Sequence, residues 1–368
     1  MRVLIYGFTG AVLGGIETFV LNMNEHMSEE CVFDYIITGD VCDYRERIEK
    51  RGGKILFLPL IRRNPFGYVR SLWRILGEEK KRGTQVFYQQ VYSMAVLPPA
   101  IMAKLRGYKV ILHAHNNGLQ KNGKIDILTH KIGKFIARLF RFTYFTNSQL
   151  STDFMFGKGV KAELVYNAID TQAFSFNSAV RDRIRTEFDC KDKTVVGFVG
   201  RLCMQKNPVF MLRVYAEFYK LCANSELWIV GDGELKCQME EVIKNLQIES
   251  SVKWFGRRND VNQLMQGMDL LLLPSLFEGL GIVLIEAQSV GLPSVSSAEV
   301  IPNEAVVTNY IKLLPLTESP SFWARKSLEL LSDCGKCLER KDARVPMNYD
   351  ISFEAKRLEV LIKCQYCN

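Results

Sequence analysis

Short apolar segments alternate with amphipathic ones along most of the chain, which is typical of parallel α/β proteins. In the first half we expect strands at residues 3–8, 33–38, 54–59, 85–88 and 109–115. Helical spacing of apolar residues lies between them, as at residues 14–23, 66–82 and 93–105. A strand at residues 163–166, followed by a polar turn, closes the series. Right-handed crossovers between such strands predict a doubly wound, Rossmann-like domain.

A second series of the same kind begins at residue 194. It has predicted strands at residues 194–199, 227–230, 252–256 and 270–273 and a predicted helix at 208–221. The chain ends in an amphipathic segment at residues 352–363, with Ser352 as a candidate helix cap. At 368 residues the chain is long for a single core. We therefore predict two tandem α/β domains, residues 1–172 and 173–349, and a final helix at about 350–368.

The most informative stretch is residues 269–287, a buried strand that leads through a glycine-rich loop into a helix. Leucines at positions 270–273 are too apolar for an exposed strand, so both faces of the sheet are expected to be covered. Glu278 in the loop and Glu286 in the helix are eight positions apart. Carboxylates accept hydrogen bonds from hydroxyl groups, and free N–H groups at a helix start favour an anion. The stretch therefore indicates a nucleotide-sugar site.

Two cations follow the first strand of the second series. Gly200 and Arg201 end that strand, and Lys206 and Asn207 precede the next helix. Arginine binds phosphate through two hydrogen bonds and lysine contributes a point charge. Ordinary surface charges are the alternative, but the position after a strand-terminal glycine favours a clamp for a diphosphate.

The first domain offers a histidine pair and a glycine cluster. His113 and His115 are two of only four histidines and project from the same face at the end of a strand. A buried structural histidine is the alternative to a functional one, and the strand-end position favours function. Gly14 and Gly15 open a helix after the first strand, but the GxGxxG spacing of a dinucleotide fold is absent, so a nicotinamide cofactor is poorly supported.

The ten cysteines do not indicate a secreted disulfide scaffold, because most stand singly in apolar segments. Two CxxC pairs, Cys334/Cys337 and Cys364/Cys367, could together hold zinc. The 26 residues between the pairs exceed the usual spacing, so reduced cysteines are favoured and no metal is expected.

The net charge of +8 is unevenly distributed. Residues 1–172 contain 24 basic and 15 acidic residues, whereas the remainder contains 24 and 25. The first half therefore favours an anionic partner. Nucleic-acid-binding motifs are absent, and a membrane surface fits better. In particular, residues 121–142 interleave six cations, from Lys121 to Arg141, with apolar residues, as in helices that lie on anionic bilayers. A helix packed on its own sheet is the alternative. No apolar run is long enough to span a bilayer, and no signal peptide is evident, so we expect a cytoplasmic location.

With these residues in view, the chain resembles the retaining glycosyltransferases of family 4, which have the GT-B fold, and is most similar to bacterial capsular and exopolysaccharide enzymes. Residues 278–286, EGLGIVLIE, resemble the family's E-x7-E signature, and the segments at 200–208 and 166–170 also match. Ala168 departs from the glycine that most members have at that turn. The resemblance covers nearly the whole chain.

The resemblance implies that the second domain binds a nucleoside diphosphate sugar, UDP-linked, and that the first domain binds the acceptor across a cleft that closes. It implies that the final helix crosses back to the first domain. The implied catalytic residues are His115, His113, Arg201, Lys206 and Glu278. The implied donor site consists of Gly14, Gly15, Gly200, Arg201, Lys206, Asn207, Gly231, Gly256, Arg257, Glu278, Gly279, Leu280, Gly281, Ile282, Val283 and Glu286.

The implied chemistry needs neither a metal nor a cofactor, because Arg201 and Lys206 would neutralise the leaving diphosphate. Glu286 would bind the ribose hydroxyls and Glu278 the hydroxyls of the sugar. The implied acceptor is an oligosaccharide on a polyprenyl diphosphate at the cytoplasmic leaflet. Two alternatives remain open, a nucleotide-sugar 2-epimerase of the same fold and a non-catalytic subunit that binds a nucleotide sugar.

Overall fold

A computed structural model describes residues 1–10, 14–118, 123–334, 340 and 343–367, and for residues 366 and 367 it describes the backbone alone. The chain divides into two compact units. The first contains residues 1–168 and 348–368, and the second contains residues 169–347.

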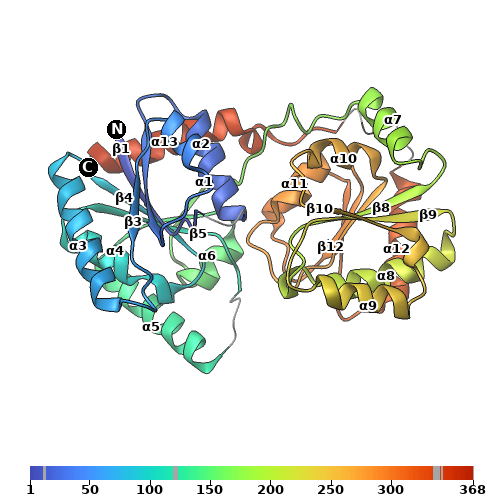
Figure 1. Cartoon of the computed structure of the whole chain (residues 1–368), viewed down its shortest axis with the longest axis horizontal. Helices are drawn as coiled ribbons and strands as arrows, with labels where there is room; N and C mark the ends of the chain where they lie inside the picture. The colour runs from blue at the N-terminus through green and yellow to red at the C-terminus, as the bar shows by residue number, and fades with distance from the viewer. Residues whose placement is uncertain (11–13, 119–122, 335–339, 341–342, 368) are drawn as a thin grey trace. The chain divides into compact units, whose positions relative to one another are not determined.

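The first unit is built on a sheet of parallel strands in the order β3-β2-β1-β4-β5-β6-β7 (Figure 1). Its strands are β1 Arg2–Tyr6, β2 Val32–Thr38, β3 Ile55–Leu58, β4 Val86–Val91, β5 Lys109–Ala114, β6 Thr143–Thr146 and β7 Glu163–Leu164. Its helices are α1 Gly15–His26, α2 Arg45–Lys50, α3 Pro65–Lys81, α4 Pro98–Leu105, α5 Lys124–Phe140, α6 Gln149–Met155 and α13 Ile351–Cys367. The direction of the strand order reverses between β1 and β4, which is where such sheets bind ligands.

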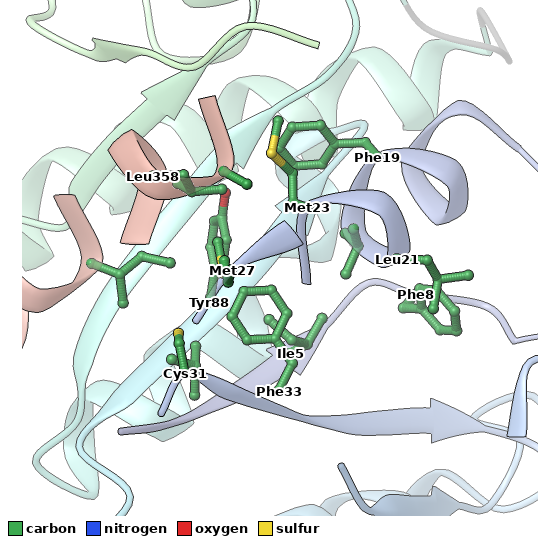
Figure 2. Packing of buried hydrophobic residues seen from close by; sticks show 14 of the residues in the cluster. Ile5, Phe8, Phe19, Leu21, Met23, Met27, Cys31, Phe33, Tyr88 and Leu358 are labelled. Carbon is green, nitrogen blue, oxygen red and sulfur yellow. The ribbon is translucent and has the colours of Figure 1, made fainter. Parts of the chain in front are cut away.

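Two hydrophobic cores cover the two faces of this sheet. Residues of α1, α2 and α13 pack on one face, and residues of α3, α4, α5 and α6 pack on the other. Figure 2 shows Leu358 of α13 beside Met23 of α1, above Ile5 and Phe33 of the sheet. The final helix thus belongs to the first unit, as predicted.

The second unit repeats the design with strands in the order β10-β9-β8-β11-β12-β13, all parallel (Figure 1). Its strands are β8 Thr194–Val199, β9 Ser225–Val230, β10 Val252–Gly256, β11 Leu270–Leu273, β12 Ser294–Ser297 and β13 Ile311–Leu314. Its helices are α7 Ser178–Glu187, α8 Pro208–Leu221, α9 Lys236–Asn245, α10 Val261–Gly267, α11 Ile282–Ser289 and α12 Pro320–Asp333. Here the order reverses between β8 and β11.

The predicted fold class, with two Rossmann-like α/β domains, is confirmed. Strand β11 is fully buried on both faces, as its leucines predicted. Two local predictions were wrong. The helix expected at residues 93–105 begins only at Pro98, because proline favours the first turn of a helix and breaks the interior of one. The start of α13 is capped by the carboxylate of Asp350, which accepts from the backbone N–H of Ser352 at 2.9 Å, so Ser352 is not the cap.

Candidate active site

In the second unit, the loops after β8 and β11 lie side by side because these strands are neighbours in the sheet. Gln205 joins the two loops. Its backbone carbonyl accepts from the N–H of Leu276 at 2.8 Å, and its side-chain amide donates to the carbonyl of Phe277 at 3.0 Å. The loop at residues 200–207, predicted to bind a diphosphate, is therefore hydrogen-bonded to the loop that carries Glu278. The two loops meet where the strand order of the sheet reverses, between β8 and β11.

An ion pair forms the centre of this structure. Lys206 Nζ lies 2.5 Å from Oε1 of Glu278, and the same oxygen accepts from the hydroxyl of Ser275 at 2.7 Å. The lysine side chain is 16% exposed and the carboxylate 5%, so both are largely withdrawn from water. The carboxylate predicted to bind the sugar thus neutralises the cation predicted to bind the diphosphate.

Glu286 lies on α11 near the same lysine. Burial raises the pKa of its carboxyl to about 7, and the charge of Lys206 offsets this shift in part. Within the described part of the chain, the Glu286 carboxylate accepts no hydrogen bond. A partly accessible carboxyl without a protein partner is suited to bind the hydroxyl groups of a ligand.

The loop before α11 exposes the start of that helix. Gly281 precedes the helix with a φ of 81°, a left-handed conformation that favours glycine. The helix runs over residues 282–289, so the N–H groups of Ile282 and Val283 in its first turn have no earlier helical carbonyl to bind. Together with the helix dipole, they favour an anion at this point. Gly279 and Leu280, in the loop, are buried beside them.

Arg201 differs from Lys206 in its surroundings. Its side chain is 60% exposed and pairs with Glu234 at 3.3 Å. An exposed pair of this kind contributes little to stability, so Arg201 is available to a ligand at small cost. Arg257, also in the implied donor set, is exposed and lies 3.9 Å from Asp232.

The implied donor glycines and Asn207 have different structural roles. A Cβ on Gly231 would lie 1.9 Å from the carbonyl oxygen of Gly200, so packing of β8 against β9 alone requires glycine there. By contrast, a Cβ on Gly256 would meet nothing within 4 Å. Asn207 adopts a left-handed conformation with a φ of 50° and precedes α8.

In the first unit, the rings of His113 and His115 lie against each other, with centres 4.1 Å apart and planes tilted by 35°. His113 is completely buried, and its Nδ1 lies 2.6 Å from the hydroxyl of Tyr88. His115 donates from Nε2 to the side-chain oxygen of Gln90 at 2.6 Å. Burial lowers the pKa of His115 to about 3 and lowers the pKa of His113 as well. Both imidazoles are therefore neutral near pH 7, and His115 lies nearer the surface.

The start of α1 contains a buried acid beside an open glycine. Glu17 accepts hydrogen bonds from the backbone N–H and the hydroxyl of Thr9, at 3.1 and 2.9 Å. A Cβ on Gly14 would lie 2.7 Å from the Glu17 carboxylate, so a larger residue there would displace the end of that side chain. Gly15 is exposed, and a Cβ on it would meet nothing within 4 Å. Packing within the described residues thus does not require a glycine at position 15.

The structure adds residues that the sequence analysis missed. Ser275 and Gln205 hold the glutamate loop, and Tyr88 and Gln90 hold the histidines. One signal was present in the sequence, because two adjacent glutamines in the otherwise apolar strand β4 indicate buried polar partners. No pattern marked the serine.

The two CxxC pairs cannot be assessed as a metal site, because Cys337 and the side chain of Cys367 lie outside the described residues. Cys364 is an exposed free thiol. Over the described residues, no group of three or more histidine, cysteine or acidic side chains is placed to hold a metal ion.

Comparison with known proteins finds a family model that matches most of the second unit. Residues 180–344 match the model of glycosyl transferases group 1. EpsF of Bacillus subtilis, described as a glycosyltransferase, is 27% identical over 337 residues, which cover 87% of this chain and 85% of EpsF. The UDP-Gal:alpha-D-GlcNAc-diphosphoundecaprenol alpha-1,3-galactosyltransferase of Escherichia coli is 32% identical over 172 residues, 44% of this chain and 43% of that enzyme.

Solved structures show the same fold. HepE of Anabaena, in a complex with UDP, matches with a TM-score of 0.81 at 17% identity, over 99% of this chain and all of that one. WaaG, a glycosyltransferase involved in lipopolysaccharide biosynthesis, matches with a TM-score of 0.66 at 16% identity, over 97% and 94% of the chains. These matches assign the predicted GT-B class to the fold.

Proposed function

Because residues 180–344 form a group 1 glycosyltransferase domain, we propose that the protein transfers a hexosyl group from a nucleoside diphosphate sugar, UDP-linked, to a saccharide or lipid-linked acceptor in cell-surface polysaccharide synthesis. The observation that carries the proposal is the cluster of Lys206, Glu278 and Glu286. Lys206 and Glu278 lie in the loops after β8 and β11, where the strand order of the second unit reverses, and Glu286 lies on the following helix α11.

In the proposed reaction the donor diphosphate binds Arg201, Lys206 and the N–H groups at the start of α11. Lys206 exchanges its bond to Glu278 for one to a phosphate oxygen, and Glu278 then accepts hydrogen bonds from the sugar. Glu286 binds the ribose hydroxyls. Fixed positive charge at the leaving group stabilises the transition state more than the ground state, because negative charge develops there.

The bond between the anomeric carbon and the diphosphate oxygen breaks, and its electron pair remains on the diphosphate. The acceptor oxygen forms the new bond on the same side of the sugar ring, and its proton passes to the departing phosphate oxygen. The anomeric configuration is therefore retained. Arg201 and Lys206 perform the charge neutralisation in this scheme, so we propose a metal-independent enzyme that needs no cofactor.

We assign the role in the first unit to His115. As a neutral imidazole with Nε2 held by Gln90, it offers Nδ1 as a hydrogen-bond acceptor for a sugar hydroxyl. His113 is too deeply buried to touch a ligand and acts by positioning its neighbour. The expectation that Gly14 and Gly15 approach the donor stays a prediction.

For the acceptor we propose an oligosaccharide on a polyprenyl diphosphate at the cytoplasmic face of the membrane. Two relatives bear names of enzymes that act on diphosphoundecaprenol-linked sugars, the E. coli galactosyltransferase and a Campylobacter jejuni N-acetylgalactosaminyltransferase. The latter is 33% identical over 127 residues, 34% of this chain. No helix in the described ranges is long and apolar enough to cross a bilayer, so membrane contact would be peripheral.

The function is tested by incubating the protein with a panel of nucleotide sugars and a bacterial lipid extract, with and without EDTA. Nucleotide release and glycolipid mass are followed, and NMR gives the anomeric configuration of the product. We expect glycolipid to form in step with nucleotide release, equally in EDTA, with the donor's configuration.

Three results would contradict the proposal or part of it. Formation of an epimerised donor or its free sugar without acceptor would indicate the 2-epimerase. Binding without turnover would indicate a non-catalytic subunit. Loss of activity in EDTA, restored by a divalent cation, would overturn the metal-independent mechanism.

A further inference from the structure

Helix α5 is fixed on the first unit by a narrow inward face. A Cβ on Gly133 would lie 2.1 Å from the carbonyl oxygen of Met94, so the helix backbone packs directly on that of the preceding segment. His130, one turn earlier, accepts from the backbone N–H of Met94 at 3.2 Å, and Ala137 is buried one turn later. The orientation of α5 about its own axis is therefore determined.

The opposite face of α5 exposes an apolar stripe. Its side chains are between 49% and 76% exposed and recur at alternating spacings of three and four, so they form one continuous row along the helix: Ile125, Leu128, Ile132, Phe135 and Leu139. A row of five large apolar residues in water is unfavourable and indicates an interaction surface.

A row of cations flanks this stripe on one side. Lys124, Lys131 and Arg138 recur every seven residues, which places them at nearly the same angle around the helix. All three are exposed, and none forms an ion pair with any residue that the structure describes. The only acid of α5, Asp126, is the third residue of the helix and lies away from this row.

Helix α3 shows the same combination. Phe66, Val69 and Trp73 are exposed at positions i, i+3 and i+7, and Phe66 is 77% exposed. Three exposed arginines accompany them without an ion pair in the described part of the chain: Arg62, Arg63 and Arg70. The helix itself was predicted from the sequence at residues 66–82, but its exposed apolar face was not.

The two helices share one side of the domain. Both pack on the same face of the sheet, with α4 between them in the strand order, while α1, α2 and α13 cover the other face (Figure 1). In a parallel α/β domain each helix starts near the carboxyl end of the preceding strand. Phe66 and Ile125, each in the first turn of its helix, therefore lie toward the edge of the sheet at which β5 ends before His115.

We propose that the exposed faces of α3 and α5 together form a docking surface for an anionic lipid bilayer. This deepens the proposed function, on which it rests, because docking would hold the sheet edge that carries His115 near a lipid-linked acceptor. A second copy of the chain fits less well. Helix pairing through the stripe would bring two rows of unpaired cations together, whereas anionic lipid head groups complement both rows and bury both apolar faces.

Binding is tested by flotation of the full chain with vesicles of phosphatidylcholine alone and with 30% phosphatidylglycerol, a composition of about one anionic lipid in three. No donor or acceptor is present, so the result does not depend on catalysis. We expect binding to the anionic vesicles that weakens at high salt. Replacing Lys131 and Arg138 by Gln, or Phe66 and Trp73 by Ser, should each lower the partition coefficient at least tenfold.

A matched control lies on the other face of the sheet, where α13 exposes Phe353, Val360 and Lys356. Replacing these by Ser, Ser and Gln should leave binding unchanged. Trp73 is the only tryptophan of the first unit. In the second unit, Trp228 and Trp323 are completely buried and Trp254 is partly buried. Brominated lipids should therefore quench its emission, and W73F should abolish this quenching.

Some outcomes would overturn the proposal. One is vesicle binding that ignores anionic lipid or is lost equally in the α13 control. Another is vesicle binding without quenching of Trp73, which would exclude α3 from the surface. A wild-type dimer in sedimentation that the α3 and α5 variants dissociate, with no vesicle binding, would assign the surface to a second copy. If vesicles bind but no donor is turned over, the proposed function fails while the docking surface stands.

Discussion

At the scale of single residues, the account depends on Lys206 being shared between two carboxylates. Its ion pair with Glu278 is largely buried, and its positive charge also lowers the pKa of Glu286 in part. Breaking such a pair costs free energy because both charges lose water on folding. A diphosphate must therefore compete with Glu278 for the lysine, which links donor binding to the release of a carboxylate for the sugar.

This competition predicts opposite effects of two substitutions on UDP affinity. Glu278→Gln frees Lys206, so UDP should bind about two- to tenfold more tightly, whereas Lys206→Ala should weaken binding at least tenfold. Isothermal titration calorimetry measures both. Equal weakening in the two variants would show that Glu278 does not restrain the lysine.

Ser275 should matter through Glu278 alone. Ser275→Ala removes the hydroxyl that donates to Oε1 of Glu278, which leaves the carboxylate less well oriented for the sugar. We expect a loss of about tenfold in kcat with little change in UDP affinity, and partial rescue by Ser275→Thr. If UDP affinity and kcat fall together, the serine supports the loop as a whole.

The raised pKa of Glu286 predicts a dependence of stability on pH. Its usual value is 4.5 and its value in the folded chain is about 7. The folded state therefore binds more protons between these pH values, and the free energy of unfolding falls as pH rises from about 5 to about 7. The loss contributed by this group is up to about 3 kcal/mol.

Urea unfolding at several pH values measures how the free energy of unfolding depends on pH. We expect this dependence to be weaker in Glu286→Gln than in the wild type.

The affinity for the donor should depend on pH in the opposite direction. If the ribose hydroxyls bind the ionised carboxylate, affinity for a nucleotide sugar should rise between pH 6 and pH 8 in the wild type and stay constant in the variant. A pH-independent affinity in both would argue against the role of Glu286.

At the scale of elements, apolar strands could be predicted from the sequence and polar or short ones could not. Strand β11, four leucines, is unmistakable, whereas β12 consists of Ser294, Val295, Ser296 and Ser297 and was missed. Its serines are buried, and the hydroxyl of Ser296 donates to the carbonyl of Leu273. Tertiary hydrogen bonds outside the segment thus stabilise a strand that local hydrophobicity does not indicate.

Tertiary interactions in the candidate site could not be predicted from the sequence either. The glutamate, lysine and histidine positions were named from the sequence, because their types and strand-end spacing are informative. The pairing of Lys206 with Glu278 was not, since it depends on β8 and β11 being neighbours although 70 residues lie between the end of β8 and the start of β11. Likewise, the sequence left open whether α5 lies on its sheet or on a bilayer, and the structure shows it packed on the sheet with an apolar face exposed.

The packing of α5 gives a prediction about stability. Gly133→Val would place side-chain atoms against the carbonyl of Met94 and should lower the free energy of unfolding by about 1–3 kcal/mol. Ile132→Ala, next to it on the exposed face, should change it by less than about 0.5 kcal/mol. Urea unfolding followed by circular dichroism compares them. Equal effects would show that the inward face of α5 is wrongly assigned.

At the scale of the whole molecule, the first unit is completed by the end of the chain. Helix α13 packs on α1, and its buried Glu354 accepts from the backbone N–H of Tyr166 at 2.8 Å. Glu359 accepts from the backbone N–H of Ser28 at 2.8 Å. Leu358 lies in the core that α1 and the sheet share (Figure 2). The chain therefore leaves the first unit after residue 168 and returns to it at residue 348.

This return predicts that the last helix is required for the stability of the first unit. Leu358→Ala should cost about 2–4 kcal/mol, because it opens a cavity in the shared core. Val360→Ala, on the exposed side of the same helix, should be nearly neutral. Thermal unfolding of both variants measures these changes in stability. An unchanged stability in Leu358→Ala would mean that α13 contributes little to the stability of the first unit.

Closure of the two units over a donor stays a prediction.

The most direct test of the central claim is the rate of sugar transfer in three proteins, measured as glycolipid formed per nucleotide released with the donor that the panel identifies. The wild type should form one glycolipid per nucleotide. Lys206→Ala should lose at least a hundredfold in rate, because the leaving diphosphate loses its buried cation. Lys220→Ala, which removes an exposed lysine paired with Glu217, should keep the wild-type rate. Undiminished transfer by a folded Lys206→Ala protein, or nucleotide release without glycolipid in the wild type, would contradict the account.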